Sequence, residues 1–300
     1  MSDANTDTTF APPRADCVAD SAGGLTFHVT DWVRPGPDAD PDAGRGSDPD
    51  AALVLVRRGA DPGPEGEVRL PLVPTEDGRL QAALPSTVPL PEGRWDVHMA
   101  LGEAEPQRLA PGLNDLRSLV DRRPGPSTSP TAVRIPYPTK HGNLSLRSWL
   151  RAPHAEAGEL RVEGGGLVVR GRLYGVERPA RWSAGAVAEA RFRPDPSRVW
   201  TGQLDLNGGD GADGAEFSFT LPLAELADGW KGGEEAWDLW LRPADPDAAP
   251  ARLARILDDV PDKKEIFTYP AQPVAAPHGT AKAGPYYTVN NDLAVRVESA

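Results

Sequence analysis

The chain contains two copies of one short motif, and this repeat limits the possible folds more than any other feature of the sequence. Residues 136–147 read PYPTKHGNLSLR and residues 285–296 read PYYTVNNDLAVR. Both follow the pattern P-Y-x-T-x-x-x-x-L-x-x-R, at an ungapped offset of 149 residues. Similarity at a fixed spacing indicates that a structural unit was duplicated, so we expect two copies of one domain.

Other segments of the two halves align in the same order. GRWDVHMAL around Trp95 matches EAWDLWLRP around Trp237, and LTFHVTDWV from Leu25 matches LVVRGRLYG from Leu167, both at an offset of 142. We call the segments around Trp95 and Trp237 the Trp-Asp segments. Each is preceded by a similar string, LQAALP in the first half and FSFTLP in the second. Each is also followed by a similar string, QRLAPGL in the first half and ARLARIL in the second. The order and the spacing therefore extend the repeat over most of the chain.

These matches predict the domain boundaries. We expect one copy over residues 24–152 and the other over residues 158–300, joined by a short polar linker at 153–157. Residues 1–23 have almost no aromatic content and are predicted to be a disordered tail. Residues 270–284, rich in proline, alanine and glycine, are expected to form a loop before the last strand.

Apolar residues alternate with polar ones inside each copy. Trp95, Val97 and Met99 fall on one side of an extended segment, and Asp96 and His98 fall on the other. This period of two is typical of a strand with one buried face. Segments of six to nine such residues are separated by glycine-rich, proline-rich and aspartate-rich turns. The chain is therefore predicted to be all-β, with two tandem antiparallel β-sandwich (Ig-like) domains.

The charge and the hydropathy of the chain exclude some classes of binding partner. The formal net charge of −12 argues against binding to nucleic acid, because the phosphate backbone is also negative. No run of 18 apolar residues is present, so no membrane span is predicted, and the chain is expected to be cytoplasmic. The single cysteine, Cys17, lies in the predicted tail and is not expected to act as a nucleophile.

The sequence carries no recognisable catalytic motif. Nucleophile elbows, zinc-ligand spacings and phosphate-binding loops are all missing, so no catalytic residue and no cofactor is predicted. One weak candidate for a metal site is the loop NGGDGADGAE, where Asp210 and Asp213 offer oxygen ligands suited to calcium. The alternative, an ordinary hairpin turn rich in glycine and aspartate, explains the same residues.

Aromatic and repeated polar residues are the candidates for ligand binding. Trp95 and Trp237 are expected to fill the two cores. Alternation places Trp240 on the opposite face from Trp237, where its ring either stacks on a sugar or packs on the other copy. Two pairs of residues occupy equivalent places in the repeated motif and are either ligand contacts or a structural corner built twice: Tyr137 with Arg147, and Tyr286 with Arg296. Asp96 and Asp238 are interpreted as turn or inter-strand partners.

The strings LPEGRWDVHMAL, RLAPGL and PYPTKHGNLSLR, with their second copies, support a resemblance. They resemble the all-β accessory repeats that actinobacteria attach to glycosyltransferases and to CDP-glycerol glycerophosphotransferase-like enzymes of the teichoic-acid type. The resemblance implies an accessory β-sandwich pair near cell-envelope or exopolysaccharide synthesis. This chain lacks the catalytic α/β domain of such fusions, so the resemblance does not imply transferase activity of its own.

Three functions remain open at the level of sequence. The first is a non-catalytic accessory protein that binds a glycan-type polymer or docks onto a partner enzyme. The second is a small transferase or hydrolase with its acids between the two copies. The third is a structural assembly component in which outward aromatic residues form subunit contacts.

Overall fold

The computed structural model describes residues 12–32, 51–61, 63, 66–102, 104–120, 122–125, 130–176, 178–207, 215–277 and 279–300. Nearly all regular structure within these ranges is β-strand, as the alternating sequence predicts. Contacts divide the chain into two compact units, Met1–Val120 with Val133–Trp149, and Asp121–Ala132 with Leu150–Ala300. We propose that these units are the two copies of the repeat.

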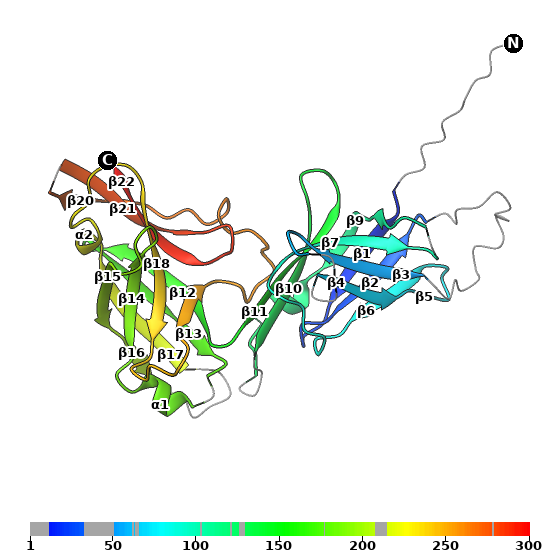
Figure 1. Ribbon diagram of the computed structural model, residues 1–300, viewed down its shortest axis with the longest axis horizontal. Helices are drawn as coiled ribbons and strands as arrows, with labels where there is room; N and C mark the ends of the chain where they lie inside the picture. Colours follow the sequence, from blue (N-terminus) through cyan, green and yellow to red (C-terminus); the bar gives the residue numbers. More distant parts are fainter. Residues whose placement is uncertain are drawn as a thin grey trace, which may run out of the picture. The chain divides into compact units, whose positions relative to one another are not determined.

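The first unit, blue to green in Figure 1, consists of two layers of strands. Among the described residues, one sheet has the order β5-β6-β2-β1-β9 and the other the order β10-β11-β7-β3-β4, with β8 beside β7. β10 and β11 lie mostly in this unit. The elements are β1 (Arg14–Ala19), β2 (Leu25–Thr30), β3 (Ala52–Arg57), β4 (Glu67–Pro71), β5 (Val73–Pro74), β6 (Leu80–Leu84), β7 (Gly93–Ala100), β8 (Gln107–Arg108), β9 (Ala110–Asp115), the 3-10 helix η2 (Arg117–Leu119), β10 (Thr131–Pro138) and β11 (Leu144–Arg151).

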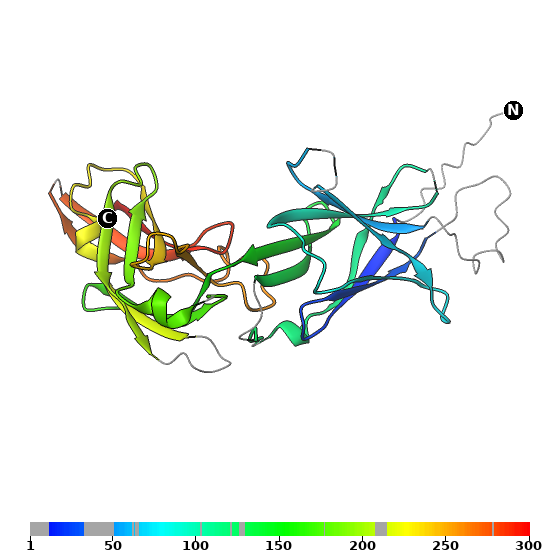
Figure 2. The ribbon, with the colours of Figure 1, turned by 60° about the horizontal axis from the view of Figure 1, so that its bottom comes forward.

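The second unit, green to red in Figures 1 and 2, has a corresponding arrangement. Its described strands follow the order β16-β17-β13-β12-β19-β18-β22-β21-β20, and β14 pairs with both β18 and β15. The elements are β12 (His154–Glu163), β13 (Gly166–Tyr174), α1 (Pro179–Ser183), β14 (Val187–Phe192), β15 (Val199–Gln203), β16 (Asp205–Asn207), β17 (Ala215–Pro222), α2 (Leu223–Leu226), β18 (Glu235–Arg242), β19 (Ala251–Ala254), β20 (Gln272–Ala276), β21 (Gly279–Tyr287) and β22 (Leu293–Ser299).

Strand pairing around the Trp-Asp strand is similar in the two units. Trp95 lies opposite Leu146 in the pair β7–β11, and Trp237 lies opposite Val295 in the pair β18–β22. These positions are the ones that the offsets of 142 and 149 align. In both units a strand after the Trp-Asp strand runs parallel to the first strand, since β9 pairs with β1 and β19 pairs with β12. The other strand pairs are antiparallel.

The two predicted core tryptophans are confirmed. Trp95 is fully buried, and Trp237 is 2% exposed. Asp96 and Asp238, the next residue in each strand, face away from the core, as alternation requires. Each unit therefore keeps its own inner face, and the polar residues of the central strand lie on its outer face.

The chain around Cys17 differs from the predicted disordered tail. Residues 14–19 form β1, which pairs with β2 on one side and β9 on the other. Ala15, Cys17 and Ala19 point inward and are buried. These residues alternate with outward-facing ones, as in any strand with one buried face. Their side chains are small, however, so the sequence lacks the large apolar residues from which a strand is predicted. Residues 1–11 lie outside the described part of the chain.

Two further expectations are wrong for related reasons. Residues 154–157, predicted as part of a linker, begin β12, where Ala155 and Ala157 are buried in the same manner as the small residues of β1. Residues 272–276 and 279–287, placed largely in a loop by their composition, form the antiparallel pair β20–β21. The acidic composition of residues 35–50, rich in proline and glycine, predicts a long solvated loop between the first two strands of the first copy, and these residues lie outside the described part of the chain.

The buried thiol gives a direct test of β1. Burial raises the pKa of Cys17, and Asp16 raises it further, so the reactive thiolate is suppressed in the folded chain. We expect an aromatic disulfide reagent to label Cys17 at least about 10³-fold more slowly in buffer than in guanidinium chloride, because labelling requires β1 to open. Labelling at the unfolded rate in buffer would show that this segment is a tail.

Candidate functional site

The outer face of the first unit carries a group of charged residues around Asp96. Arg58, which follows β3, places its Nη2 atom 2.6 Å from Oδ1 of Asp96, and Nη1 of Arg108 lies 2.6 Å from the same oxygen. The hydroxyl of Ser145 on β11 donates to this oxygen at 3.1 Å. One carboxylate therefore joins side chains from three neighbouring segments of the sheet.

The second unit builds the same group around Asp238. Nη2 of Arg193, which follows β14, lies 2.6 Å from Oδ1 of Asp238, and Nη2 of Arg252 on β19 lies 2.8 Å from it. Arg252 also approaches Asp292, whose Oδ1 atom is 2.8 Å from Arg151. As the sequence predicted, both aspartates are inter-strand partners.

The two groups occupy equivalent positions. Arg58 follows β3, which lies beside β7, and Arg193 follows β14, which lies beside β18. On the neighbouring strand, Arg108 lies opposite His98 of β7, and Arg252 lies opposite Trp240 of β18. The repeated Tyr of the sequence motif lies beside each group, and the repeated Arg joins it in the second unit, where Arg296 lies over Tyr286. We call these sets the outer clusters. They comprise Arg58, Asp96, Arg108 and Tyr137 in the first unit, and Arg193, Asp238, Arg252, Tyr286 and Arg296 in the second.

Electrostatics keep the central aspartate of the first outer cluster ionised. Burial by itself raises the pKa of Asp96, but hydrogen bonds from Arg58 and Arg108 outweigh it, so the pKa is lowered overall. A general acid at neutral pH needs a raised pKa. Asp96 is therefore an acceptor that holds two guanidinium groups, and it is unsuited to donate a proton.

The repeated tyrosines lie beside the same arginines. The pKa of Arg58 is raised first by its hydrogen bond to Asp96 and further by Tyr137, and the pKa of Arg193 is raised in the same order by Asp238 and Tyr286. The Arg58 and Arg193 side chains remain 41% and 45% exposed. Each outer cluster thus presents a fixed guanidinium to solvent.

The repeated arginines differ between the units. The guanidinium of Arg296 lies 4.6 Å from the ring centre of Tyr286, and its Nε atom is 3.3 Å from Glu234. Arg147 is 5% exposed, and its guanidinium lies 5.0 Å from the ring centre of Trp149. The predicted pairing of Tyr with Arg is therefore a contact in the second unit, whereas Arg147 lies over another ring.

Trp240 lies on the outer face of β18, half-buried, as alternation predicts. The guanidinium groups of Arg191 and Arg252 lie 4.7 Å and 5.2 Å from its ring centre. Arg191 pairs in turn with Glu189, which also accepts a hydrogen bond from Arg242. The Trp240 ring therefore lies against two arginines of the outer face.

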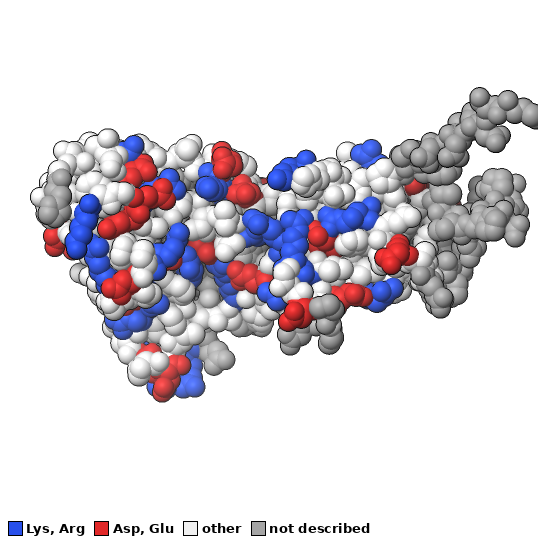
Figure 3. Space-filling view, turned by 45° about the horizontal axis from the view of Figure 1, so that its top comes forward, with Lys and Arg blue, Asp and Glu red and all other residues white. Residues whose placement is uncertain are grey.

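Charged residues of both signs are interspersed on the surface shown in Figure 3. Within the residues that the structure describes, no group of three or more His, Cys, Asp or Glu is placed to hold a metal ion. The weak calcium candidates Asp210 and Asp213 lie outside the described residues. No described helix is long and apolar enough to cross a membrane.

Sequence reasoning found some members of the outer clusters and missed others. The motif supplied Tyr137, Tyr286 and Arg296, and it also marked Arg147, which lies over Trp149 instead. Arg108 and Arg252 occupy the same position in the aligned strings QRLAPGL and ARLARIL. Their equivalence could therefore have been predicted from the sequence. Arg58 and Arg193 had no such signal, because β3 and β14 share too little sequence to be aligned.

Comparisons with known proteins give little beyond the fold described above. No family model matches the chain, and no curated protein matches it. Among solved structures, S. aureus TarS 217-571 matches with a TM-score of 0.28 and 14% sequence identity. The match covers 81% of this chain and 62% of that one, so the chain spans less than two thirds of that structure. A likeness this distant carries no argument about function.

Proposed function

We propose that this protein is a non-catalytic accessory protein that binds a glycan-type polymer through its outer clusters, in association with a cell-envelope or exopolysaccharide transferase. The observation that carries the proposal is the repetition of one polar group at the same place in both units. Core residues repeat because the fold requires them. A repeated, partly exposed set of arginines and a tyrosine on the outer face has chemistry suited to a ligand as well.

The composition of the clusters suits a hydroxyl-rich polymer. Arg58 and Arg193 are held by Asp96 and Asp238, so little side-chain freedom remains to be lost when a ligand binds. Their remaining N–H groups can donate to hydroxyl or carboxylate oxygens, and the adjacent phenols can both donate and accept. Two equal sites on one chain also suit a polymer, because the second binding event becomes intramolecular.

The test replaces the more exposed arginine of each cluster. Arg58→Gln and Arg193→Gln leave each aspartate its second partner, Arg108 or Arg252, so both units should remain folded. We expect each variant to weaken binding to a soluble polymer about tenfold, since a hydrogen bond from a charged donor is worth roughly 1.5–3 kcal/mol. The double variant should lose most of the affinity. Affinity electrophoresis in xanthan, gellan and dextran, with soluble peptidoglycan fragments as competitors, measures this.

Matched controls use arginines in exposed ion pairs elsewhere. Arg79→Gln in the first unit and Arg161→Gln in the second break pairs with Asp77 and Glu159, and binding should not change. If none of these polymers binds, or if the double variant binds like the unchanged protein, the proposal is wrong. Turnover of a nucleotide sugar or CDP-glycerol by the purified protein would favour the transferase hypothesis instead.

A further inference from the structure

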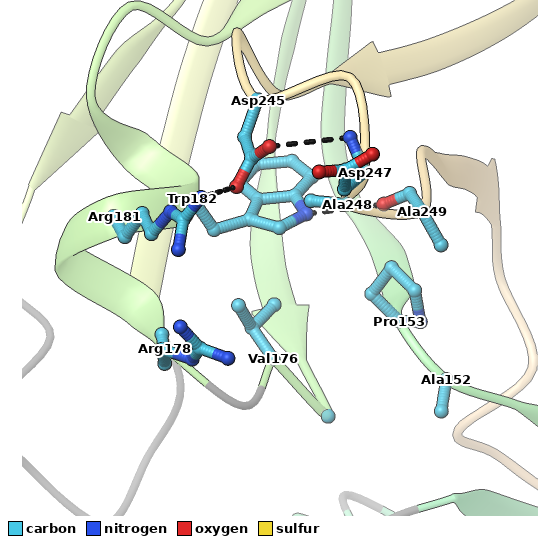
Figure 4. Close-up of a pocket in the computed structure, with 11 residues that line it drawn as sticks. Ala152, Pro153, Val176, Arg178, Arg181, Trp182, Asp245, Asp247, Ala248 and Ala249 are labelled. Carbon is cyan, nitrogen blue, oxygen red and sulfur yellow. Dashed lines mark hydrogen bonds and ion pairs between the residues drawn. The ribbon is translucent and has the colours of Figure 1, made fainter.

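A pocket of about 410 Å³ lies within the second unit, apart from the outer cluster. It is formed by the chain before β12, the segment after β13, α1 and the turn after β18, and Figure 4 shows the residues around it. Its volume falls in the range of pockets that hold small molecules. A glycosyl residue is of suitable size for such a space.

One side of the pocket is apolar and fixed. Trp182 is 5% exposed, and its Nε1 atom donates to the carbonyl oxygen of Ala249 at 3.1 Å. Because this hydrogen bond orients the indole, the ring cannot turn away from the pocket without losing it. Val176 and Pro153 lie on the same hollow (Figure 4). The C–H groups of a sugar ring pack favourably on such a wall.

The charged residues of the pocket fall into two kinds. Arg181 and Asp245 form an ion pair at 2.8 Å, and Asp245 also accepts a hydrogen bond from the backbone N–H of Asp247. The side chains of Arg181 and Asp245 therefore already have partners within the protein. The side chains of Arg178 and Asp247 have no hydrogen bond or ion pair within the described part of the chain. Figure 4 shows them on different sides of the Trp182 indole.

We infer that this pocket binds a single glycosyl residue that carries a carboxylate substituent. The guanidinium of Arg178 suits the carboxylate because it can donate two parallel hydrogen bonds. The Asp247 carboxylate is an acceptor for ring hydroxyl groups, and Trp182 contacts the apolar part of the ring. The choice of a sugar rests on the proposed function, while the requirement for an acidic group rests on the guanidinium of Arg178, which has no ion pair among the residues that the structure describes.

The test titrates the intact protein with three matched ligands and follows the indole N–H resonance of Trp182 by NMR. Methyl glucuronide, methyl glucoside and methyl glucosaminide differ in the charge that they carry. We expect methyl glucuronide to shift the resonance and to bind at least fivefold more tightly than methyl glucoside. Arg178→Gln should abolish this preference, and Asp247→Asn should weaken both ligands about tenfold. Arg161→Gln serves as the matched control, and Trp182→Phe assigns the resonance.

Other outcomes contradict the inference. Equal binding of the glucuronide and the glucoside, preference for the glucosaminide, or no shift of the Trp182 resonance would each show that the pocket does not select an acidic sugar. Failure here is distinguishable from failure of the proposed function, because polymer binding is tested through Arg58 and Arg193. If the Arg58 and Arg193 variants lose polymer binding but glucuronide does not bind at Trp182, the proposed function is supported and the inference about this pocket is wrong.

Discussion

The Trp95→Ala variant is expected to lose about 3–5 kcal/mol of the free energy of unfolding of the first unit. Trp95 is fully buried on β7, and its Nε1 atom donates to the carbonyl oxygen of Pro91 at 3.0 Å. Truncation removes one of the two fully buried tryptophan side chains of this unit. It leaves a cavity that the strands on both sides cannot fill without losing their pairing. It also leaves the Pro91 carbonyl without this donor. Denaturant unfolding followed by circular dichroism measures the change.

Trp237→Ala is expected to have an effect of similar size on the second unit. Trp237 is 2% exposed, lies 5.2 Å from the ring of Phe192, and has the guanidinium of Arg198 at 4.8 Å from its ring centre. Because each tryptophan belongs to its own inner face, we expect two unfolding transitions, and each variant should lower only one of them.

The control for these variants is Trp240→Ala, which removes the same type of side chain from a half-buried outer position. We expect it to cost about 1 kcal/mol, the typical effect of a substitution that removes no large core side chain. If Trp95→Ala and Trp237→Ala moved a single common transition, the two units would not unfold separately. If both cost as little as Trp240→Ala, neither tryptophan would be a main core residue.

Sequence periodicity predicted the fold well where side chains are large. In β7 and β18 the alternation of bulky apolar and polar residues identified the buried face correctly, and the structure pairs these strands with β11 and β22 at equivalent positions. The physical reason is that a one-residue slip would bury Asp96 or Asp238 and expose the tryptophan. Such strands have only one acceptable register.

Periodicity failed where the buried residues are small. β1 and β12 each run between two other strands, with alanines and Cys17 facing inward. Small side chains carry little hydrophobic signal, and the neighbouring proline, glycine and charged residues suggested a tail and a linker. Backbone pairing on both sides stabilises these strands, and a single sequence does not reveal which strand will lie beside them.

The candidate site was predicted in part for a similar reason. Tyr137 and Tyr286 could be found because they repeat in sequence. Their grouping with Asp96 and Asp238 depends on strand order, since β10 and β7 are brought together through β11. The pocket beside Trp182 could not have been predicted, because it combines the chain just before β12 with a turn about 95 residues later in the chain.

Asp258→Ala is expected to destabilise the second unit by about 3–5 kcal/mol, the usual cost of removing one partner from a buried ion pair. Lys263 is fully buried, and its Nζ atom lies 2.6 Å from Oδ1 of Asp258 and 2.9 Å from the carbonyl oxygen of Val260. Burial lowers the pKa of Lys263, and Asp258 opposes this effect. Without the carboxylate, the ammonium group would keep a single neutral acceptor. Thermal unfolding of the second unit measures the loss.

The reverse substitution separates charge from packing at the same place. Lys263→Met removes the buried ammonium but keeps most of the side-chain volume, and Asp258 retains Nε of Arg255 at 3.2 Å and the N–H of Val260 at 3.0 Å. We therefore expect Lys263→Met to cost about 1 kcal/mol or less, because an ion pair replaced by an apolar group of similar size is often neutral. Adding it to Asp258→Ala should restore part of the lost stability, which a double-mutant cycle measures. If Lys263→Met costs as much as Asp258→Ala, then the lysine stabilises this loop through more than its pairing with Asp258, and the argument from an uncompensated charge is wrong.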